Sequence, residues 1–265
     1  MTTATVTEIN QTEAIERDHL VTLPAGDLYN AVANAMLFAS KDDSLPVLNA
    51  VLLRYDKATK ALTVTATDRY RMIFTLAGDS ETMSTDAESF DALISLARAK
   101  DMAARLKNFK KFDDPQMQIE FMDSKLEMIY YERGNELIEQ IPLIEDANYP
   151  AITSLIKDAF KEAAYTPKTD LDRAAATVPN QRIGAYASFN PAYLGDVAKV
   201  KDLRLTPSQR RNDTVDIALS TNQRKPSLFR HGNWAYGLVM PVFIKDRRDG
   251  LEHLSDMTEA PAWIS

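Results

Sequence analysis

The sequence predicts an α+β fold in which one helix followed by antiparallel strands forms a repeated unit. In some segments apolar residues recur at three- and four-residue spacing, which indicates amphipathic helices. Other apolar runs are short and end at turns rich in Asp, Asn or Gly, as the strands of hairpins do. This order of helix and strands occurs twice in segments of similar length, so we expect an internally duplicated domain.

The first unit begins with a short strand at Val21–Pro24. Leu28, Ala31 and Ala35 follow at helical spacing and predict a helix over Asp27–Lys41, with Asp27 placed to cap its start. Three strands are expected next, at Ala50–Tyr55, Ala61–Thr67 and Arg71–Ala77.

The second unit begins with a helix predicted over Ser89–Lys110, with a break near Lys100-Asp101. Asp123-Ser124 and Arg133-Gly134-Asn135 have the residue types that favour hairpin turns. The expected strands are Gln116–Met122, Leu126–Tyr131 and Glu136–Pro142.

The last part of the chain predicts a third and shorter unit. We expect a helix at Ile156–Ala164, a strand at Arg182–Phe189 and a helix from Asn190 to about Leu203. His231-Gly232-Asn233 is expected to form a hairpin turn. The remaining strands are predicted at Val215–Ser220, Ser227–Arg230 and Trp234–Ile244.

The composition is that of an ordinary globular protein, with 45% hydrophobic and 26% charged residues among 265. No apolar run approaches the ~20 residues that cross a bilayer, and Met1–Ile15 lacks the pattern of a signal peptide. The absence of cysteine excludes disulfides and thiolate sites. We therefore expect a cytoplasmic protein. Its net charge of −7 shows no basic excess, although net charge hides how charge is distributed.

Nothing in the sequence indicates an enzyme. His19, His231 and His253 have no metal-ligand spacing to another ligand, and no glycine-rich phosphate loop is present. Acidic pairs such as Asp42-Asp43 fall in expected turns, where carboxylates are usually solvated. We expect no catalytic residue, no metal and no cofactor.

Five segments, in this order along the chain, carry a family resemblance. They are Val21-Thr-Leu-Pro24 with Leu45-Pro-Val-Leu-Asn49, Thr65-Ala-Thr-Asp-Arg-Tyr-Arg-Met72, Tyr149-Pro150, Phe189-Asn-Pro-Ala-Tyr-Leu194, and Lys225-Pro226 with Leu238-Val-Met-Pro-Val242. Together they resemble the middle and last domains of the bacterial DNA polymerase III beta subunit, the sliding clamp family. The resemblance implies the DNA-clamp fold.

The resemblance also implies a hydrophobic pocket that accepts short peptides from DNA polymerases, clamp-loader subunits and repair proteins. Leucine, methionine, valine and proline would form a socket for an apolar anchor, with polar residues at its edge. The residues that match the family's pocket are Leu48, Thr67, Arg69, Tyr70, Arg71, Met72, Pro150, Leu155, Pro226, Leu238, Val239, Met240 and Pro241. Leu48, Leu238 and Val239 could instead be ordinary core residues of strands.

A clamp would contact double-stranded DNA without reading its bases, through basic residues on the helices that line the ring. An ordinary solvated helix face is the alternative for these residues, and the first helix is nearly free of basic residues. The expected DNA-facing residues are Arg98, Lys100, Arg105, Lys107, Lys110, Lys111, Lys199 and Lys201.

The resemblance implies four segments. Residues 1–18 form a leader, 19–149 a domain like the family's middle domain, 150–245 a shortened form of its last domain, and 246–265 a tail. The family's first domain has no counterpart here, which favours a homotrimeric ring and a phage-type protein. The tail could fold back into the pocket as a competitor, although a free tail is the simpler expectation.

Two functions follow from this resemblance. The first is a processivity clamp that encircles DNA as a homo-oligomer and tethers a polymerase. The alternative is a clamp-derived adaptor or decoy that binds clamp-interacting peptides without enclosing DNA. Size-exclusion chromatography with light scattering would separate the two.

Overall fold

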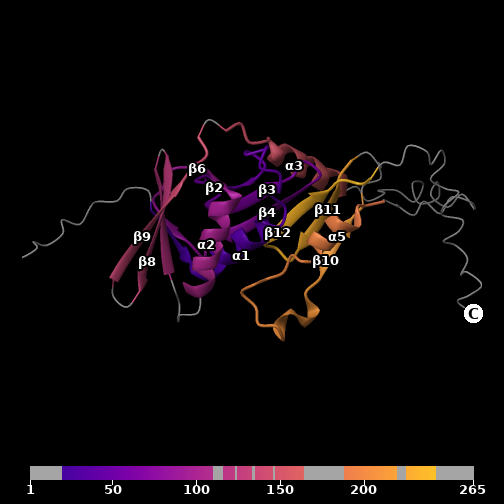
Figure 1. Ribbon diagram of the computed structural model, residues 1–265. Coiled ribbons are helices and arrows are strands. Elements are labelled where there is room, and N and C mark those ends of the chain that lie inside the picture. Colours follow the sequence, from indigo (N-terminus) through magenta and orange to yellow (C-terminus); the bar gives the residue numbers. More distant parts are fainter. Residues whose placement is uncertain are drawn as a thin grey trace, which may run out of the picture. The chain divides into compact units, whose positions relative to one another are not determined.

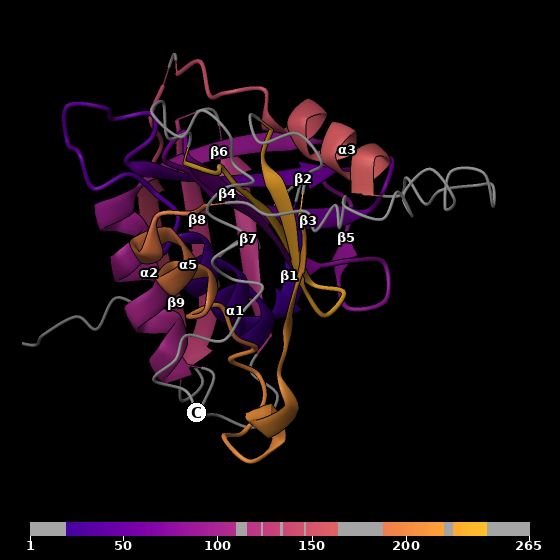
Figure 2. The same ribbon diagram turned by 90° about the vertical axis from the view of Figure 1, so that its right-hand side faces the viewer.

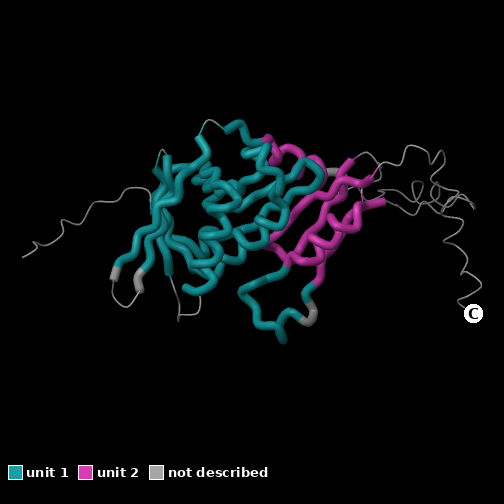
Figure 3. Tube along the Cα trace, viewed as in Figure 1, with its two compact units in different colours: residues 1–149, 201–213 teal, residues 150–200, 214–265 magenta. Residues whose placement is uncertain are grey.

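The computed structural model describes residues 20–109, 116–122, 124–132, 135–145, 147–163, 188–219 and 225–242 (Figure 1). These residues belong to two compact units (Figure 3). Unit 1 comprises the chain up to Tyr149 together with residues 201–213, and unit 2 comprises residues 150–200 and the chain from Thr214 onward. The fold is α+β with antiparallel sheets, as the sequence predicts.

Unit 1 contains two antiparallel sets of strands. One sheet has the order β5-β1-β7-β8-β9, and in the other β4, β3, β2 and β6 are neighbours in that order. The first sheet consists of β1 (Leu20–Pro24), β5 (Ser84–Thr85), β7 (Gln116–Met122), β8 (Lys125–Glu132) and β9 (Asn135–Pro142). The second set consists of β2 (Ala50–Asp56), β3 (Ala61–Thr67), β4 (Arg71–Gly78) and β6 (Phe90–Ser95).

Two helices of unit 1, α1 (Ala25–Ala35) and α2 (Leu96–Phe109), cover these strands (Figure 2). The helix α1 packs against β3 and β4, α2 packs against β2 and β6, and the two helices also contact each other. Their apolar stripes supply the core together with the inward residues of both sheets. Fully buried members include Leu23, Leu28, Leu53, Leu62, Ile73, Ile94, Met102, Leu106, Met117 and Ile119.

The start and end of α1 differ from the prediction. Pro24 is the N-cap residue with φ −62°, and the helix begins at Ala25, so Asp27 lies in its first turn and does not cap it. The helix ends at Ala35, whereas the apolar spacing predicted Lys41. Phe38 and Ala39 nevertheless stay buried, because the loop that follows α1 folds onto the core.

Residues 89–95 were predicted to be the start of a helix, and this prediction is wrong. They contain β6, whose six residues pair with β2 from Tyr55↔Phe90 to Ala50↔Ser95. Apolar residues over such a short run have no decisive period, and the long-range pairing with β2 selects the strand. The predicted break near Lys100-Asp101 is also absent, because Ala99, Met102 and Leu106 continue the buried stripe of α2.

Unit 2 contains α3 (Ile152–Ala163), α5 (Pro191–Val197) and an antiparallel sheet in which α3 packs against β11 and β12. The sheet has the order β10 (Val215–Ala218), β11 (Ser227–His231), β12 (Ala235–Val239). The predicted turn at His231-Gly232-Asn233 joins β11 to β12, with Gly232 at φ +57°. Glycine suits this left-handed conformation.

Several predicted boundaries in the second half of the chain were wrong. The helix α3 begins at Ile152, four residues before the predicted start, and β12 ends at Val239 rather than at Ile244. The helix α5 ends at Val197, well before Leu203, because residues 201–204 leave the helical path to bond with α1. The predicted leader, residues 182–187 of the predicted strand, and the predicted tail lie outside the described residues.

Among the described residues, no helix has the length and hydrophobicity required to cross a membrane.

Several residues between Leu143 and Tyr149 pack against β2 and β6. The Ile144 N–H donates to the Leu93 carbonyl oxygen over 2.8 Å, and Ile144, Ala147 and Tyr149 pack against a cluster that includes Leu52 and Leu93. The Tyr149 hydroxyl is buried and has no hydrogen-bond partner within the described part of the chain. Burial raises the pKa of this phenol above its ordinary value, because the anion would lose its hydration.

We predict that Tyr149→Phe removes a loss of stability at high pH. The folded protein keeps this phenol protonated, whereas the unfolded chain ionises near pH 10, so unfolding becomes more favourable as the pH rises above about 10. At pH 7 the substitution should be neutral or stabilise by up to about 1 kcal/mol, because the hydroxyl it deletes is unpaired.

Urea denaturation of wild type and variant at pH 7 and above pH 10 measures both effects. Tyr70→Phe, which alters an exposed tyrosine of the same unit, is the control. A clear loss of stability in Tyr149→Phe at pH 7 would show that the hydroxyl has a partner after all.

Candidate functional site

The turn between β3 and β4 is closed by hydrogen bonds from its own side chains. Asp68 Oδ1 accepts from the backbone N–H groups of Tyr70 and Arg71, each over 3.0 Å. The Thr67 hydroxyl donates to the Arg71 carbonyl oxygen over 2.9 Å and accepts from the Arg69 N–H over 3.2 Å. We call residues Thr67–Met72 the β3–β4 turn.

Arg69 occupies the left-handed region of backbone space, with φ +80°. A non-glycine residue there costs on the order of 1 kcal/mol or more, which the hydrogen bonds of the turn offset. The result is that Tyr70 stands at the tip of the turn with 57% of its surface exposed. Backbone strain combined with an exposed aromatic side chain makes this turn a candidate binding element.

Arg71 ties the β3–β4 turn to the loop that follows α1. It is buried, its Nε donates to Asp68 Oδ2 over 2.9 Å, and its guanidinium carbon lies 5.4 Å from the centre of the Phe38 ring. This geometry combines an ion pair with a cation–π contact. The same loop carries Asp42, whose pKa is lowered mainly by hydrogen bonds from Ser44 and to a smaller extent by the charge of Arg69.

The six predicted pocket residues of unit 1 divide into two classes. Arg69 and Tyr70 are exposed on the β3–β4 turn. Leu48, Thr67, Arg71 and Met72 are buried. Of these six residues, only Arg69 and Tyr70 at the tip of the turn therefore offer an exposed surface to a ligand.

The predicted pocket residues of unit 2 lie on α3 and around β11 and β12. Leu155 is 51% exposed on α3, whereas Leu238 and Val239 are buried in β12. Met240 and Pro241 follow the end of β12 and are half-buried, so the proline interrupts no strand hydrogen bond. Pro150 precedes α3 and is exposed, and Pro226 precedes β11 and is half-buried.

The basic residues predicted to face DNA are exposed where the structure describes them. On α2, the Arg105 Nε lies 2.7 Å from Glu139 Oε2 of β9, and mainly the charge of Glu139 raises the pKa of this guanidinium. Lys199 of unit 2 pairs with Asp196 over 2.7 Å. Lys110 and Lys111 lie outside the described residues. Arg98, Lys100, Lys107 and Lys201 are exposed as well.

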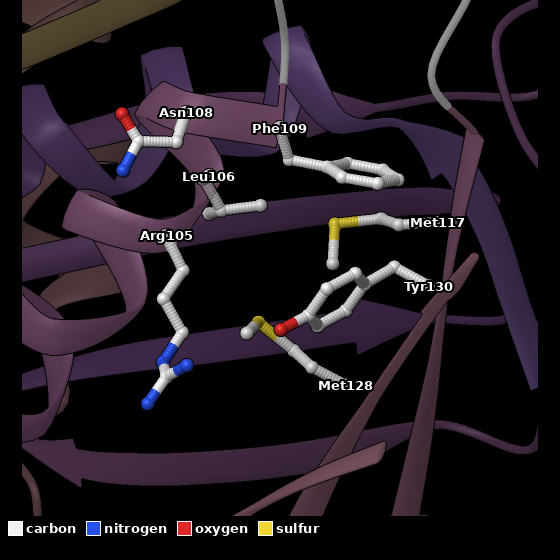
Figure 4. A pocket seen from close by; sticks show the side chains of 7 residues that line it. All are labelled: Arg105, Leu106, Asn108, Phe109, Met117, Met128 and Tyr130. Atoms are coloured by element: carbon white, nitrogen blue, oxygen red, sulfur yellow. The ribbon is translucent and has the colours of Figure 1, made fainter. Parts of the chain in front are cut away.

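A cavity of about 290 Å³ lies at the C-terminal end of α2, beside Arg105 (Figure 4). Leu106, Met117 and Met128 give it an apolar lining, with Phe109 and Tyr130 in edge-to-face contact at 5.0 Å between ring centres. None of the residues predicted for the peptide pocket lines it. No group of three or more His, Cys, Asp or Glu residues in the described ranges could hold a metal ion.

Comparison with known proteins identifies relatives of this chain, although no family model matches it. The beta sliding clamp of Micrococcus luteus is 26% identical over 163 residues, which are 62% of this chain and 47% of the relative. The chain therefore spans about half the length of that clamp. The resemblance to the beta sliding clamp family is confirmed.

Solved clamp structures share the fold. The sliding clamp of Bacillus subtilis is 17% identical with a TM-score of 0.56, covering 89% of this chain and 67% of its own. A Pseudomonas aeruginosa clamp bound to griselimycin is 13% identical with a TM-score of 0.58, covering 89% of this chain and 68% of its own. The DNA polymerase III beta subunit of Thermotoga maritima is 14% identical with a TM-score of 0.55, and the match covers 90% of this chain and 69% of the Thermotoga chain.

Two residues that shape the β3–β4 turn are absent from the predicted pocket residues, although Asp68 lies within a segment that carries the family resemblance. Asp68 holds three groups of the turn, and Phe38 lies against the Arg71 guanidinium. A signal for Asp68 was available, because an aspartate at the start of a turn commonly accepts from backbone N–H groups two and three residues later. No local signal marks Phe38, which is 33 positions from Arg71 in the chain.

We predict that Asp68→Ala destabilises the clamp-like unit 1 by about 2–3 kcal/mol, because it removes two backbone hydrogen bonds and the charged partner of a buried arginine. Asp68→Asn should cost less, since its oxygen can still accept from the turn. Chemical denaturation measures both, with Asp101→Ala on exposed α2 as the control. An Asp68→Ala protein as stable as this control would contradict the role given to Asp68.

Proposed function

We propose that this chain acts as a DNA sliding clamp, a processivity factor that encircles double-stranded DNA as a homo-oligomer. In this proposal it binds DNA polymerase and clamp-loader subunits through short peptide motifs. The observation that carries the proposal is the β3–β4 turn, which is strained, held by hydrogen bonds and exposes Tyr70 in a chain with the clamp fold.

The chemistry of the proposed peptide-binding residues suits an apolar anchor. Tyr70 of unit 1 and Leu155 of unit 2 each expose more than half of their surface, so both side chains are available to an apolar ligand group. Met240 is half-buried, and a methionine adapts to ligands of different shape. We propose that both sets of residues contact the same peptide.

The proposed contact with DNA uses unpaired lysines of unit 1. Lys100 and Lys107 lie on the exposed face of α2, seven residues and therefore about 10 Å apart along the helix axis. Neither has an ion-pair partner among the residues that the structure describes. Such lysines neutralise phosphates without reading bases, which suits a protein that must move along DNA.

If the chain forms a ring, light scattering after size exclusion should give a mass of about 90 kDa, three times the 29.7 kDa of one chain. The ring should remain on nicked circular DNA after loading and leave once the DNA is cut, because a closed ring is held by topology. A monomer that binds clamp-interacting peptides but shows no preference for circular DNA would establish the adaptor or decoy function and refute the ring.

We predict that Tyr70→Ala weakens binding of a clamp ligand at least tenfold, because it deletes the exposed aromatic anchor. Griselimycin, which is bound to the Pseudomonas aeruginosa clamp, is a suitable probe, and its affinity can be measured by calorimetry. Leu155→Ala tests the residues of unit 2 in the same way. Ile138→Ala, at another exposed apolar residue, should leave the affinity unchanged. Wild-type affinity in both Tyr70→Ala and Leu155→Ala would sink the assignment of the pocket.

A further inference from the structure

One side of α1 carries a row of polar residues, Asp27, Asn30 and Asn34, at three- and four-residue spacing. Asn30 and Asn34 are buried, with exposures of 0% and 2%. What covers them is the segment Lys201–Asp213, which returns to unit 1 between two stretches of unit 2. We call this segment the strap.

The two asparagines hold the strap through its backbone. Asn34 accepts from the Lys201 N–H over 3.1 Å and donates to the Lys201 carbonyl oxygen over 3.0 Å, so its amide pairs with Lys201 as a neighbouring strand would. Asn30 Oδ1 accepts from the Leu203 N–H over 2.8 Å. These contacts fix the position of the Lys201 backbone on α1 and leave its side chain exposed.

The rest of the strap is fixed through Asp202 and Arg204. The Arg204 guanidinium donates to both oxygens of Asp202 over 2.8 and 2.7 Å and to Asp27 Oδ1 over 3.2 Å. These carboxylates raise the pKa of Arg204, mainly through the hydrogen bonds to Asp202. Arg210 Nη1 also donates to the Asp202 carbonyl oxygen over 3.1 Å. Because these bonds include the strap's own side chains, the strap has a defined shape on α1.

The strap places basic residues beside α1, which has none of its own. Between Ala25 and Ala35, α1 has one charged residue, the acidic Asp27. The strap adds Lys201, Arg204, Arg210 and Arg211 against Asp202 and Asp213. Within the described residues the Lys201 ammonium has no ion-pair partner, unlike Arg204. A helix without basic residues is thus covered by a segment that exposes a free lysine beside it.

We propose that the strap is a DNA-contacting element that, together with α2, binds the phosphate backbone, and that Asn34 is the residue that positions Lys201 for this contact. This inference rests on the proposed clamp function. It explains how a unit whose α1 lacks cations can still attract DNA, since α2 and the strap both contact α1. The alternative is that the strap only stabilises unit 1 through its bonds to α1. In that case, replacing the Lys201 side chain should not change the affinity for DNA.

Salt dependence distinguishes the two roles, because each phosphate contact adds about 0.9 to the slope of log affinity against log salt concentration. The probe is a labelled linear DNA duplex, titrated with the full chain by fluorescence anisotropy between about 50 and about 200 mM NaCl. Five variants are compared with wild type: Lys201→Gln, Lys201→Arg, Asn34→Ala, the double variant Lys100→Gln/Lys107→Gln on α2, and Lys60→Gln as a control at the exposed turn between β2 and β3.

Lys201→Gln should lower the magnitude of the slope by about 0.9. The ratio of wild-type affinity to variant affinity should therefore fall about threefold between the lowest and the highest salt concentration. Lys201→Arg should restore the wild-type slope, which a packing defect would not do. Asn34→Ala should lower the slope as Lys201→Gln does although Lys201 is still present, and Lys60→Gln should leave it unchanged.

Three results would each overturn the inference alone, while Lys100→Gln/Lys107→Gln on α2 still lowers the slope: a wild-type slope in Lys201→Gln, a wild-type slope in Asn34→Ala, or failure of Lys201→Arg to restore the slope. If wild type itself shows no salt-dependent affinity for DNA, the clamp function fails and the inference fails with it. The two failures are therefore distinguishable in one set of titrations.

Discussion

The burial of α1 on two chemically different sides is the constraint on which the rest of unit 1 depends. Its apolar side packs against β3 and β4, and the Thr75 hydroxyl of β4 donates to the Ala31 carbonyl oxygen over 3.0 Å. Its polar side binds the strap through Asn30 and Asn34. The loop that leaves its C-terminal end carries Phe38, against which Arg71 lies. Both the β3–β4 turn and the strap are thus fixed relative to one short helix.

The burial of two asparagines is costly unless their hydrogen-bonding groups are satisfied. The Asn34 Nδ2 also donates to the Asn30 carbonyl oxygen within α1 over 2.8 Å, whereas its Oδ1 accepts from the Lys201 N–H of the strap. The interaction is therefore specific: an apolar residue at position 34 could pack against the strap but could not fix its register. Polar contacts of this kind determine position more than they add stability.

The part of the fold that could be predicted is the part that is determined locally. The strands β2, β3, β4, β7, β8 and β9 lie within one or two residues of their predicted bounds, because hairpin turns between them carry their own Asx and Gly signals. The strand β6 was missed because its identity depends on pairing with β2, 35 or more residues away. The strap was missed for the same reason, as its bonds to α1 span some 170 positions.

The candidate site divides in the same way. Family resemblance predicted that Thr67–Met72 matters, and the structure describes a strained turn there. Resemblance could not say which of its residues support the turn and which are exposed. Met72 and Tyr70 are both large and apolar, yet one is 5% exposed and the other 57%. The difference arises from strand pairing at Thr67↔Met72 and from the left-handed Arg69 between them, neither of which is encoded by residue type.

The distribution of ion pairs bears on how a chain with a net charge of −7 could move on DNA. Arg105 and Arg204 are held by carboxylates of their own unit, so their charge is largely compensated at short range. In the proposed clamp, Lys100, Lys107 and Lys201 would contact phosphates, and a flexible lysine makes a single point-charge contact where arginine would make a bidentate one. Few and geometrically undemanding contacts give weak, sequence-independent attraction, and weak attraction is what permits sliding. In the proposed clamp, the acidic remainder of the surface would then limit DNA contact to the positions of these lysines.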